Sequence, residues 1–269
     1  MPKGIALTIG LNHVDTTHYS GWNGNLNACE ADAIDMADIA KSKKFSTKIL
    51  ITEEATRSNV TDEILRAAQS LKAGDIFMLA CSCCGGKLPD LIHLSVSGLL
   101  DTWCLYDSQL LTFEIRSLLT NFQKGVRVLL FSDSCNSGTV VKLPDDQRNA
   151  PEFRFKFMPP DFALRTYRQN QGFYEKIIRD PGLKKALGAI KASVLWIFGC
   201  QDNQMSADGD FNGVFTAHIL KVWKNGAFRG DYRNFHKSLV SQMPPDQTPN
   251  FFRLGVINKK FETQRPFTI

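Results

Sequence analysis

Short apolar runs alternate with segments of helical periodicity along most of this 269-residue chain. The apolar runs predict strands at residues 4–11, 47–51, 75–81, 126–132 and 193–199, with a last one at 251–257. Between them, apolar residues recur at three- and four-residue steps, which predicts helices over residues 26–40, 60–71, 112–122, 211–224 and 231–242. This alternation indicates a mostly parallel sheet with helices packed against it.

One segment, residues 142–192, breaks the alternation. It contains the stretches PDDQR, MPP and RDPG, and it holds eleven Lys or Arg against six Asp or Glu within residues 142–191, which accounts for the whole net charge of +5. We interpret it as a basic insertion within a single domain spanning 1–269. The chain length suits one sizeable core.

Composition excludes several classes of protein. The basic excess is local and no reader motif accompanies it, so we expect no nucleic-acid partner. No apolar run is long enough for a membrane helix, and the N-terminal MPKGIALTIG is typical of a first strand rather than a signal peptide. Seven cysteines, an odd number without a secretory signal, indicate reduced thiols and a cytoplasmic location.

Two polar motifs follow predicted strands. SCCGG occupies residues 82–86 after the third strand, and DSCNSG occupies residues 133–138 after the fourth. Because the carboxyl ends of parallel strands lie at one edge of a sheet, we expect the two motifs to meet there. Polar neighbours around Cys135 indicate a solvent-facing thiol beside backbone N–H groups that can stabilise an oxyanion, rather than a buried core cysteine.

The chain resembles the caspase-like cysteine peptidases of the metacaspase and bacterial orthocaspase branch. DSCNSGT resembles the nucleophile motif of that family, and the resemblance continues through ALTIGLNHVDTTHYSGWNGNLNACEADA, DTWCLYDSQL, SVLWIFGCQDNQMSADG, NGVFTAHILKVW and MPPDQTPNFFRLG. It implies a six-stranded, mostly parallel sheet with helices on both faces. It also implies a large-subunit-like half at 1–141, a linker at 142–192 and a small-subunit-like half at 193–269.

The resemblance implies cysteine peptidase activity after Arg or Lys, with Cys135 as nucleophile and a histidine at the end of the third strand. The family motif there reads Ser-Gly-His-Gly-Gly, whereas this chain has Cys84 at the histidine position. A neutral thiol offers no cation to activate Cys135 and no acid near neutrality to protonate the leaving amine. We therefore predict an inactive or strongly impaired peptidase, either naturally or by deliberate substitution.

Rescue by another histidine is not expected. His218 lies on an apolar helical stripe and His236 in a predicted surface helix. His13 and His18 follow the first predicted strand, and His93 lies nine residues after Cys84. The acidic run typical of the family is replaced by LIHLSVSGLLD, and its acidic pair by Thr112 and Phe113. Calcium requires several oxygen ligands, so we expect neither calcium activation nor any other cofactor.

The specificity pocket of the family matches four positions in this chain: Cys29, Asp32, Ser82 and Asp133. Two carboxylates in a partly desolvated pocket favour a guanidinium or an ammonium, so the expected partner is a peptide or protein with exposed Arg or Lys. If each residue is considered alone, Asp32 also fits an exposed position on a helix, and Asp133 also fits a residue that caps the turn at Cys135.

The cysteines leave other functions open. Cys84 and Cys135 would be near disulfide distance if their strands meet, which is the basis of a redox-responsive alternative. A zinc site is less favoured, because CxCC lacks the usual ligand spacing, and we predict no metal. A third alternative is an active Arg/Lys-specific peptidase with another proton shuttle. The insertion carries candidate cleavage points at Lys142, Arg148, Arg154, Arg165 and Arg168.

Overall fold

The computed structural model describes residues 1–134, 154–186, 190–201 and 204–269. Its main sheet has six strands in the order β2-β1-β3-β7-β8-β9, of which β9 alone runs antiparallel to its neighbour. The strands are β1 (Gly4–Gly10), β2 (Ser46–Ile51), β3 (Ile76–Ser82), β7 (Arg127–Asp133), β8 (Ser193–Phe198) and β9 (Asn250–Gly255). All six strand predictions are confirmed, with bounds shifted by one or two residues.

The central strands are buried on both faces, which explains their nearly continuous apolar sequences. Along β3, Phe77, Leu79 and Cys81 join one core cluster, and the alternating Met78 and Ala80 join the other. This is the two-residue period of a strand with helices on each side. The sheet therefore separates two hydrophobic layers.

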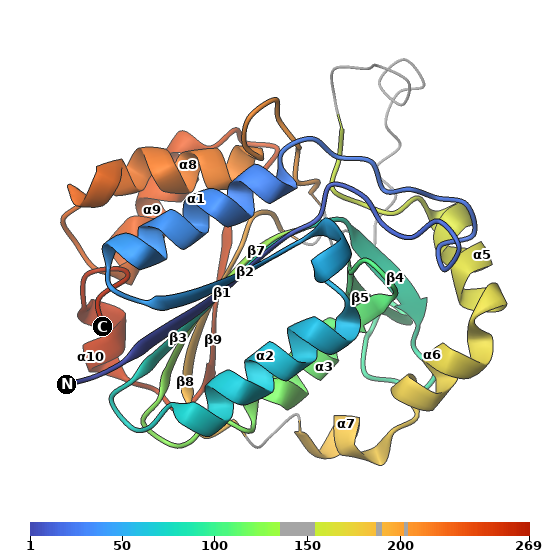
Figure 1. The fold of residues 1–269 in the computed structure, drawn as a ribbon, viewed down its shortest axis with the longest axis horizontal. Coiled ribbons are helices and arrows are strands. Elements are labelled where there is room, and N and C mark those ends of the chain that lie inside the picture. Colours follow the sequence, from blue (N-terminus) through green and yellow to red (C-terminus); the bar gives the residue numbers. More distant parts are fainter. Residues whose placement is uncertain (135–153, 187–189, 202–203) are drawn as a thin grey trace.

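Helices cover both faces, as Figure 1 shows. One layer consists of α2 (Arg57–Ser70) and α3 (Thr112–Leu119), and the other of α1 (Cys29–Ser42), α8 (Val214–Trp223) and α9 (Tyr232–Gln242). Short helical turns lie at η1 (Thr52–Glu54), η2 (Lys224–Gly226) and α10 (Lys259–Thr263). The predicted arrangement of a mostly parallel sheet between helices is confirmed.

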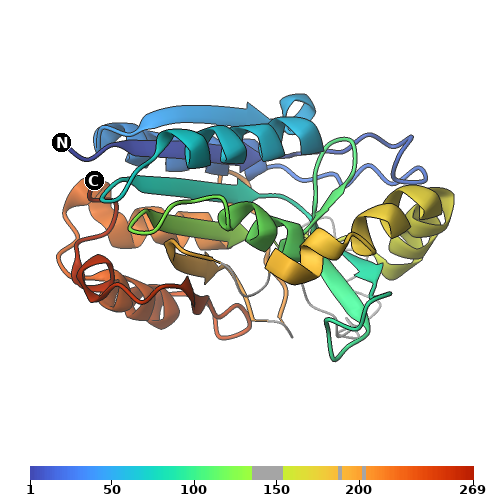
Figure 2. The ribbon, with the colours of Figure 1, turned by 90° about the horizontal axis from the view of Figure 1, so that it is seen from below.

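A second, three-stranded sheet was not predicted. It comprises β4 (Gly85–Pro89), β5 (Leu99–Cys104) and β6 (Gln109–Leu111), paired antiparallel. Both views place it beyond the carboxyl ends of the parallel strands (Figures 1 and 2). Its first strand reads GGKLP, a sequence without the β-branched and aromatic residues that indicate strands.

The predicted basic insertion contains regular structure. Three helices, α5 (Pro160–Gln169), α6 (Gln171–Ile178) and α7 (Pro181–Ala186), lie within it. Tyr174 and Ile178 of α6 pack against Leu88, Leu100 and Leu111 of the small sheet. Prolines that favoured a loop reading start α5 and α7 instead, because proline is well tolerated in the first turn of a helix. Among the described residues, no helix has the length and apolar character that crossing a membrane requires.

The β1–α1 connection requires a close backbone approach at Gly10. A Cβ added there would collide with the Cys29 carbonyl group at the start of α1. We predict that Gly10→Ala lowers the free energy of unfolding by about 1–3 kcal/mol, as overpacking does, in urea denaturation. The matched control is Gly172→Ala in α6, where nothing lies within 4 Å. That change should be neutral or stabilising; equal effects of both would contradict the close approach.

Candidate peptide-binding site

Four of the predicted site residues come from two strands and one helix start. Ser82 and Asp133 are the last residues of the adjacent strands β3 and β7, and they are register partners. Cys29 and Asp32 lie in the first turn of α1. All four side chains are buried, with Asp32 and Asp133 only 1% and 2% exposed.

A lysine from the insertion fills the space between the acidic residues. The Lys156 Nζ donates to Asp32 Oδ2 at 2.8 Å, to Asp133 Oδ2 at 2.7 Å and to Ser82 Oγ at 2.8 Å. Lys156 is fully buried. An ammonium has three protons, and here each has an acceptor, which is the condition for burying such a charge. We call Asp32, Ser82 and Asp133 the acidic pocket.

The acidic pocket is itself held in place by hydrogen bonds. Asp133 Oδ1 accepts from the Ser206 hydroxyl, and Asp32 Oδ1 accepts from the Gly213 backbone N–H at 2.9 Å. Ser82 Oγ also donates to Asp32 Oδ2 at 2.7 Å. Gly213 has no room for a side chain, because a Cβ would collide with the Lys156 ammonium. These hydrogen bonds orient both carboxylates beside the Lys156 ammonium.

Electrostatics favour the charged lysine. Burial alone would lower the pKa of Lys156, but Asp133 and Asp32 outweigh it and raise the pKa well above the ordinary lysine value. Burial raises the pKa of Asp133, and the Asp32 charge adds to this, whereas Lys156 acts in the opposite direction. The Lys156 ammonium therefore compensates the two buried carboxylates, which would be costly to bury without a cation.

The backbone around Lys156 is hydrogen-bonded on two sides, with isolated bridges from Phe155 to Ala207 and from Phe157 to Gly85. Lys156 N–H donates to the Ser206 carbonyl at 3.0 Å, and Asp208 N–H donates to the Arg154 carbonyl at 2.8 Å. On the other side, Gly85 N–H donates to the Lys156 carbonyl at 2.9 Å, and Met158 N–H donates to the Gly85 carbonyl at 2.8 Å. The segment bends at Lys156, where the Phe157 N–H donates to the Phe155 carbonyl at 2.8 Å. We call residues 154–158 the substrate-like segment, because sheet edges bind peptides through main-chain hydrogen bonds of this kind.

Cys84 adjoins this segment and is only 4% exposed. Its Sγ lies 3.7 Å from the Gly24 carbonyl oxygen, and it belongs to a buried apolar cluster with Cys29, Cys104 and Met158. Burial, followed by the neighbouring thiols, raises its pKa well above the ordinary cysteine value. Cys84 is therefore a neutral thiol at neutral pH.

The histidines, all within the described residues, lie in other settings. His13 pairs with Glu53, His18 with the Tyr174 hydroxyl, His218 with the Val214 carbonyl and His236 with the Pro249 carbonyl, while His93 is exposed in the β4–β5 loop. Burial lowers the pKa of His18 and of His236, which favours their neutral forms.

Cys135 lies outside the described residues, as do Lys142, Arg148 and the proposed Cys84–Cys135 disulfide. The six described cysteines are free thiols. In the described ranges, His, Cys, Asp and Glu side chains form no group of three that could hold a metal ion. Thr112 and Phe113 begin α3.

Lys156 was not among the site residues predicted from the sequence. Of the described cleavage candidates, Arg154 donates to Asn27 Oδ1, Arg165 lies over the Phe162 ring and Arg168 is exposed. The sequence did carry a signal: FRFKF alternates large apolar and basic residues, which is typical of an extended segment, and two prolines follow at 159–160.

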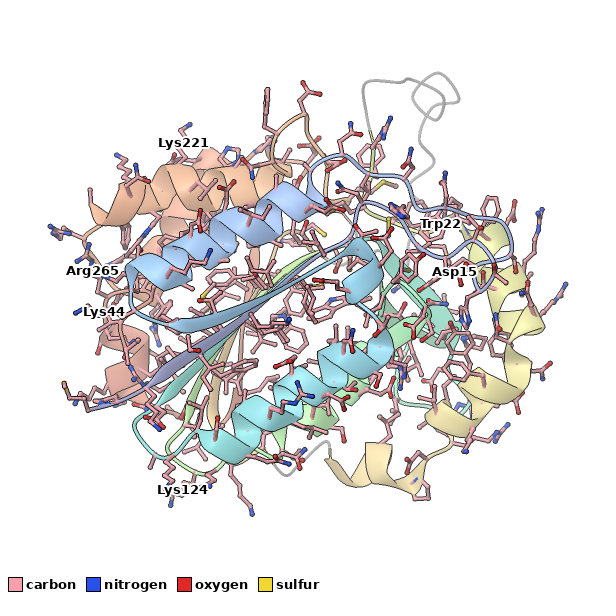
Figure 3. The ribbon with its side chains drawn as sticks, in the orientation of Figure 1. Asp15, Trp22, Lys44, Lys124, Lys221 and Arg265 are labelled. Carbon is pink, nitrogen blue, oxygen red and sulfur yellow. The ribbon has the colours of Figure 1, made fainter. Side chains whose placement is uncertain are left out.

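Figure 3 shows Asp15 and Trp22 on the loop from β1 to α1, at one end of the molecule, with Lys44 and Arg265 at the opposite end.

Comparisons with known proteins find a matching family model and several relatives. A family model described as the caspase domain matches residues 3–261. Metacaspase-1 of Arabidopsis thaliana is 27% identical over 217 residues, which cover 75% of this chain and 52% of that protein. The chain spans 24–59% of the length of the curated relatives it matches.

Two solved structures are also similar. The crystal structure of protein GSU0716 from Geobacter sulfurreducens shares 52% identity, with a TM-score of 0.89 over 99% of both chains. Caspase-1 from Spodoptera frugiperda has a TM-score of 0.53 and 10% identity, covering 93% of this chain and 86% of that one. The second likeness concerns the fold alone, and it confirms the predicted caspase-like architecture.

Removing the buried cation should destabilise the protein in a pH-dependent way. Breaking one partner out of a buried ion pair costs about 3–5 kcal/mol, so Lys156→Met should lower the free energy of unfolding by that order at neutral pH. Without Lys156 the pKa of Asp133 rises further above its unfolded value. The folded state then takes up a proton more readily than the unfolded state, so the deficit should shrink as pH falls from about 8 to about 5.

Urea denaturation at several pH values measures this, with Lys176→Met as control, because Lys176 is an exposed residue of α6. The control should change stability by less than about 0.5 kcal/mol. A deficit for Lys156→Met that is independent of pH would contradict the predicted proton uptake by Asp133.

Proposed function

This chain belongs to the caspase-domain family of cysteine peptidases, and we propose that it binds peptides through a basic residue while hydrolysis is lost or strongly impaired. The observation that carries the binding part is the Lys156 ammonium held by Asp32, Asp133 and Ser82. The observation that carries the impairment is the thiol of Cys84 at the family's histidine position.

The acidic pocket suits Arg or Lys at the position before the scissile bond. Its two carboxylates are desolvated and fixed by Ser206 and Gly213, so they attract a cation without reorganising. A neutral side chain would leave two carboxylates buried without a counter-charge, which is costly. The proposed partner is therefore a peptide or protein with an accessible Arg or Lys.

Part of the catalytic arrangement also fits. The Gly85 N–H contacts the Lys156 carbonyl oxygen, which is where an oxyanion would develop during attack on that carbonyl. By family resemblance the attacking thiol is Cys135. The acidic pocket can thus bind the substrate and the Gly85 N–H can stabilise the oxyanion, but no described group is placed to transfer protons.

Proton transfer is the deficient step. Hydrolysis of an amide needs a base to deprotonate the thiol and an acid to protonate the leaving nitrogen. Cys84 is buried with a raised pKa, so near neutrality it neither accepts the proton of another thiol nor offers a charged acid. General acid–base catalysis contributes about 10²–10⁴-fold, which sets the expected scale of the loss.

The alternatives receive less support. An active peptidase with another shuttle would need an imidazole near Cys84, but four of the five histidines are paired elsewhere and His93 is exposed on a loop. A redox module would favour accessible thiols of low pKa. Burial instead raises the pKa of Cys29, Cys83, Cys84 and Cys104.

Turnover of fluorogenic peptides ending in Arg or Lys tests this function. In reductant, with or without calcium, the unaltered protein and Lys156→Ala should show no turnover above background. Adding Cys84→His to Lys156→Ala should restore turnover after Arg or Lys but not after Asp, because an imidazole can exchange protons near neutrality. Adding Cys135→Ala as well should abolish it. Turnover by the unaltered protein that Cys135→Ala removes would overturn the proposed impairment.

Self-cleavage should also be absent. The purified chain should remain intact on a denaturing gel after prolonged incubation in reductant, because no group protonates the leaving nitrogen. Mass spectrometry would locate any break. A spontaneous cut after Lys156, or after one of the five basic residues named from the sequence, would contradict the impairment if Cys135→Ala prevented it.

A further inference from the structure

The substrate-like segment alternates between buried and half-buried residues. Lys156 and Met158 are 0% and 2% exposed, whereas Phe155 and Phe157 remain half-buried. The chain bends at Lys156, between the isolated bridges that Phe155 and Phe157 form with Ala207 and Gly85. Two side chains, two positions apart, therefore anchor the segment.

The second anchor lies beside Cys84. Met158 shares a buried apolar cluster with Val14, Leu26, Cys84 and Cys104, and its N–H donates to the carbonyl of Gly85, the residue after Cys84. A neutral thiol is a small, polarisable apolar group, and methionine is a flexible one, so the two are compatible in a dry cluster. An imidazole at this position would bring polar nitrogens that need partners.

The backbone contacts do not depend on the sequence of the bound segment. The carbonyl of Arg154, both polar groups of Lys156 and the N–H of Met158 are matched by backbone groups of Gly85, Ser206 and Asp208. Main-chain pairing of this kind supplies affinity, and the pockets for alternate side chains supply specificity. Another peptide with the same two anchors meets every one of these requirements.

We propose that residues 154–158 are an internal ligand of this site, which recognises a basic residue followed two positions later by methionine or a similar apolar side chain, with Cys84 forming part of the second subsite. This rests on the proposed function, since the first subsite is its acidic pocket. The internal copy closes the site, and an external peptide of this kind binds when the internal copy is displaced. At position 84, a side chain that transfers protons in the family is thus replaced by one that contacts the bound peptide.

Binding of a labelled peptide Arg-Phe-Lys-Phe-Met-Pro, blocked at both ends, tests the proposal by fluorescence anisotropy. It should bind a Lys156→Ala, Met158→Ala double variant at least tenfold more tightly than the unaltered protein, because the double variant lacks both internal anchors. Lys176→Ala, an exposed substitution on α6, should behave like the unaltered protein. Replacing the peptide lysine by norleucine, or its methionine by serine, should weaken binding to the double variant at least tenfold.

A third substitution isolates the second subsite. Adding Cys84→Ser to the double variant should reduce the preference for methionine over serine in the peptide and leave the preference for lysine over norleucine intact. A merely structural role of Cys84 would weaken all peptides equally. That result, or lysine-dependent binding without any preference for methionine, would overturn the second subsite.

The remaining outcomes separate the two proposals. Lysine-dependent binding that is equally tight in the unaltered protein and the double variant would leave the proposed function standing and overturn the internal ligand. Binding that ignores the lysine in every protein would overturn the proposed function itself.

Met158→Ser alone provides a test that keeps the buried charges paired. In the folded, unaltered protein, acetylation of Lys156 by an amine-reactive reagent should be at least tenfold slower than that of Lys176, as peptide mass spectrometry measures. Met158→Ser should speed acetylation of Lys156 at least tenfold and leave Lys176 unchanged. Lys156 reacting as fast as Lys176 in the unaltered protein, or no response to Met158→Ser, would overturn the proposal.

Discussion

The ammonium of Lys156 between two buried carboxylates is the interaction on which this site depends. Asp32 comes from the start of α1, Asp133 from the end of β7, and Lys156 from the segment before α5. Removing two carboxylates from water is costly unless a cation and hydrogen bonds compensate. Lys156, Ser82, Ser206 and Gly213 provide that compensation, so the pocket is complete only when a basic side chain occupies it.

The proposed function separates binding from catalysis. The acidic pocket and the Gly85 N–H would contact any peptide placed like residues 154–158. These contacts accelerate a reaction only if they stabilise the transition state more than the bound ground state. Proton transfer to the leaving nitrogen stabilises the transition state in this selective way. Cys84, as a buried neutral thiol, cannot supply that proton transfer. Under the proposed function, the single replacement at position 84 removes the reaction and leaves recognition in place.

Periodicity predicted the six strands and the main helices because their own sequences carry the pattern. The helices are amphipathic, and the central strands are nearly continuous in apolar residues because they are buried on both faces. Periodicity failed for β4, where glycines and a proline form a strand that pairs with β5 of the small sheet. It also failed for α5–α7, whose apolar residues pack on that unpredicted sheet. In both places the partner surface, rather than local propensity, stabilises the element.

The sequence alone determined which residues stand at the ends of β3 and β7, and it placed Ser82, Cys84 and Asp133 there without an imidazole. That follows from strand positions and residue types, which are local properties. Only the tertiary structure decided which cation meets Asp32, since Lys156 lies 124 residues away and many other basic residues were equally plausible. The choice depends on a backbone path that brings residues 154–158 between Gly85 and Ser206, and no local pattern encodes such a long-range contact.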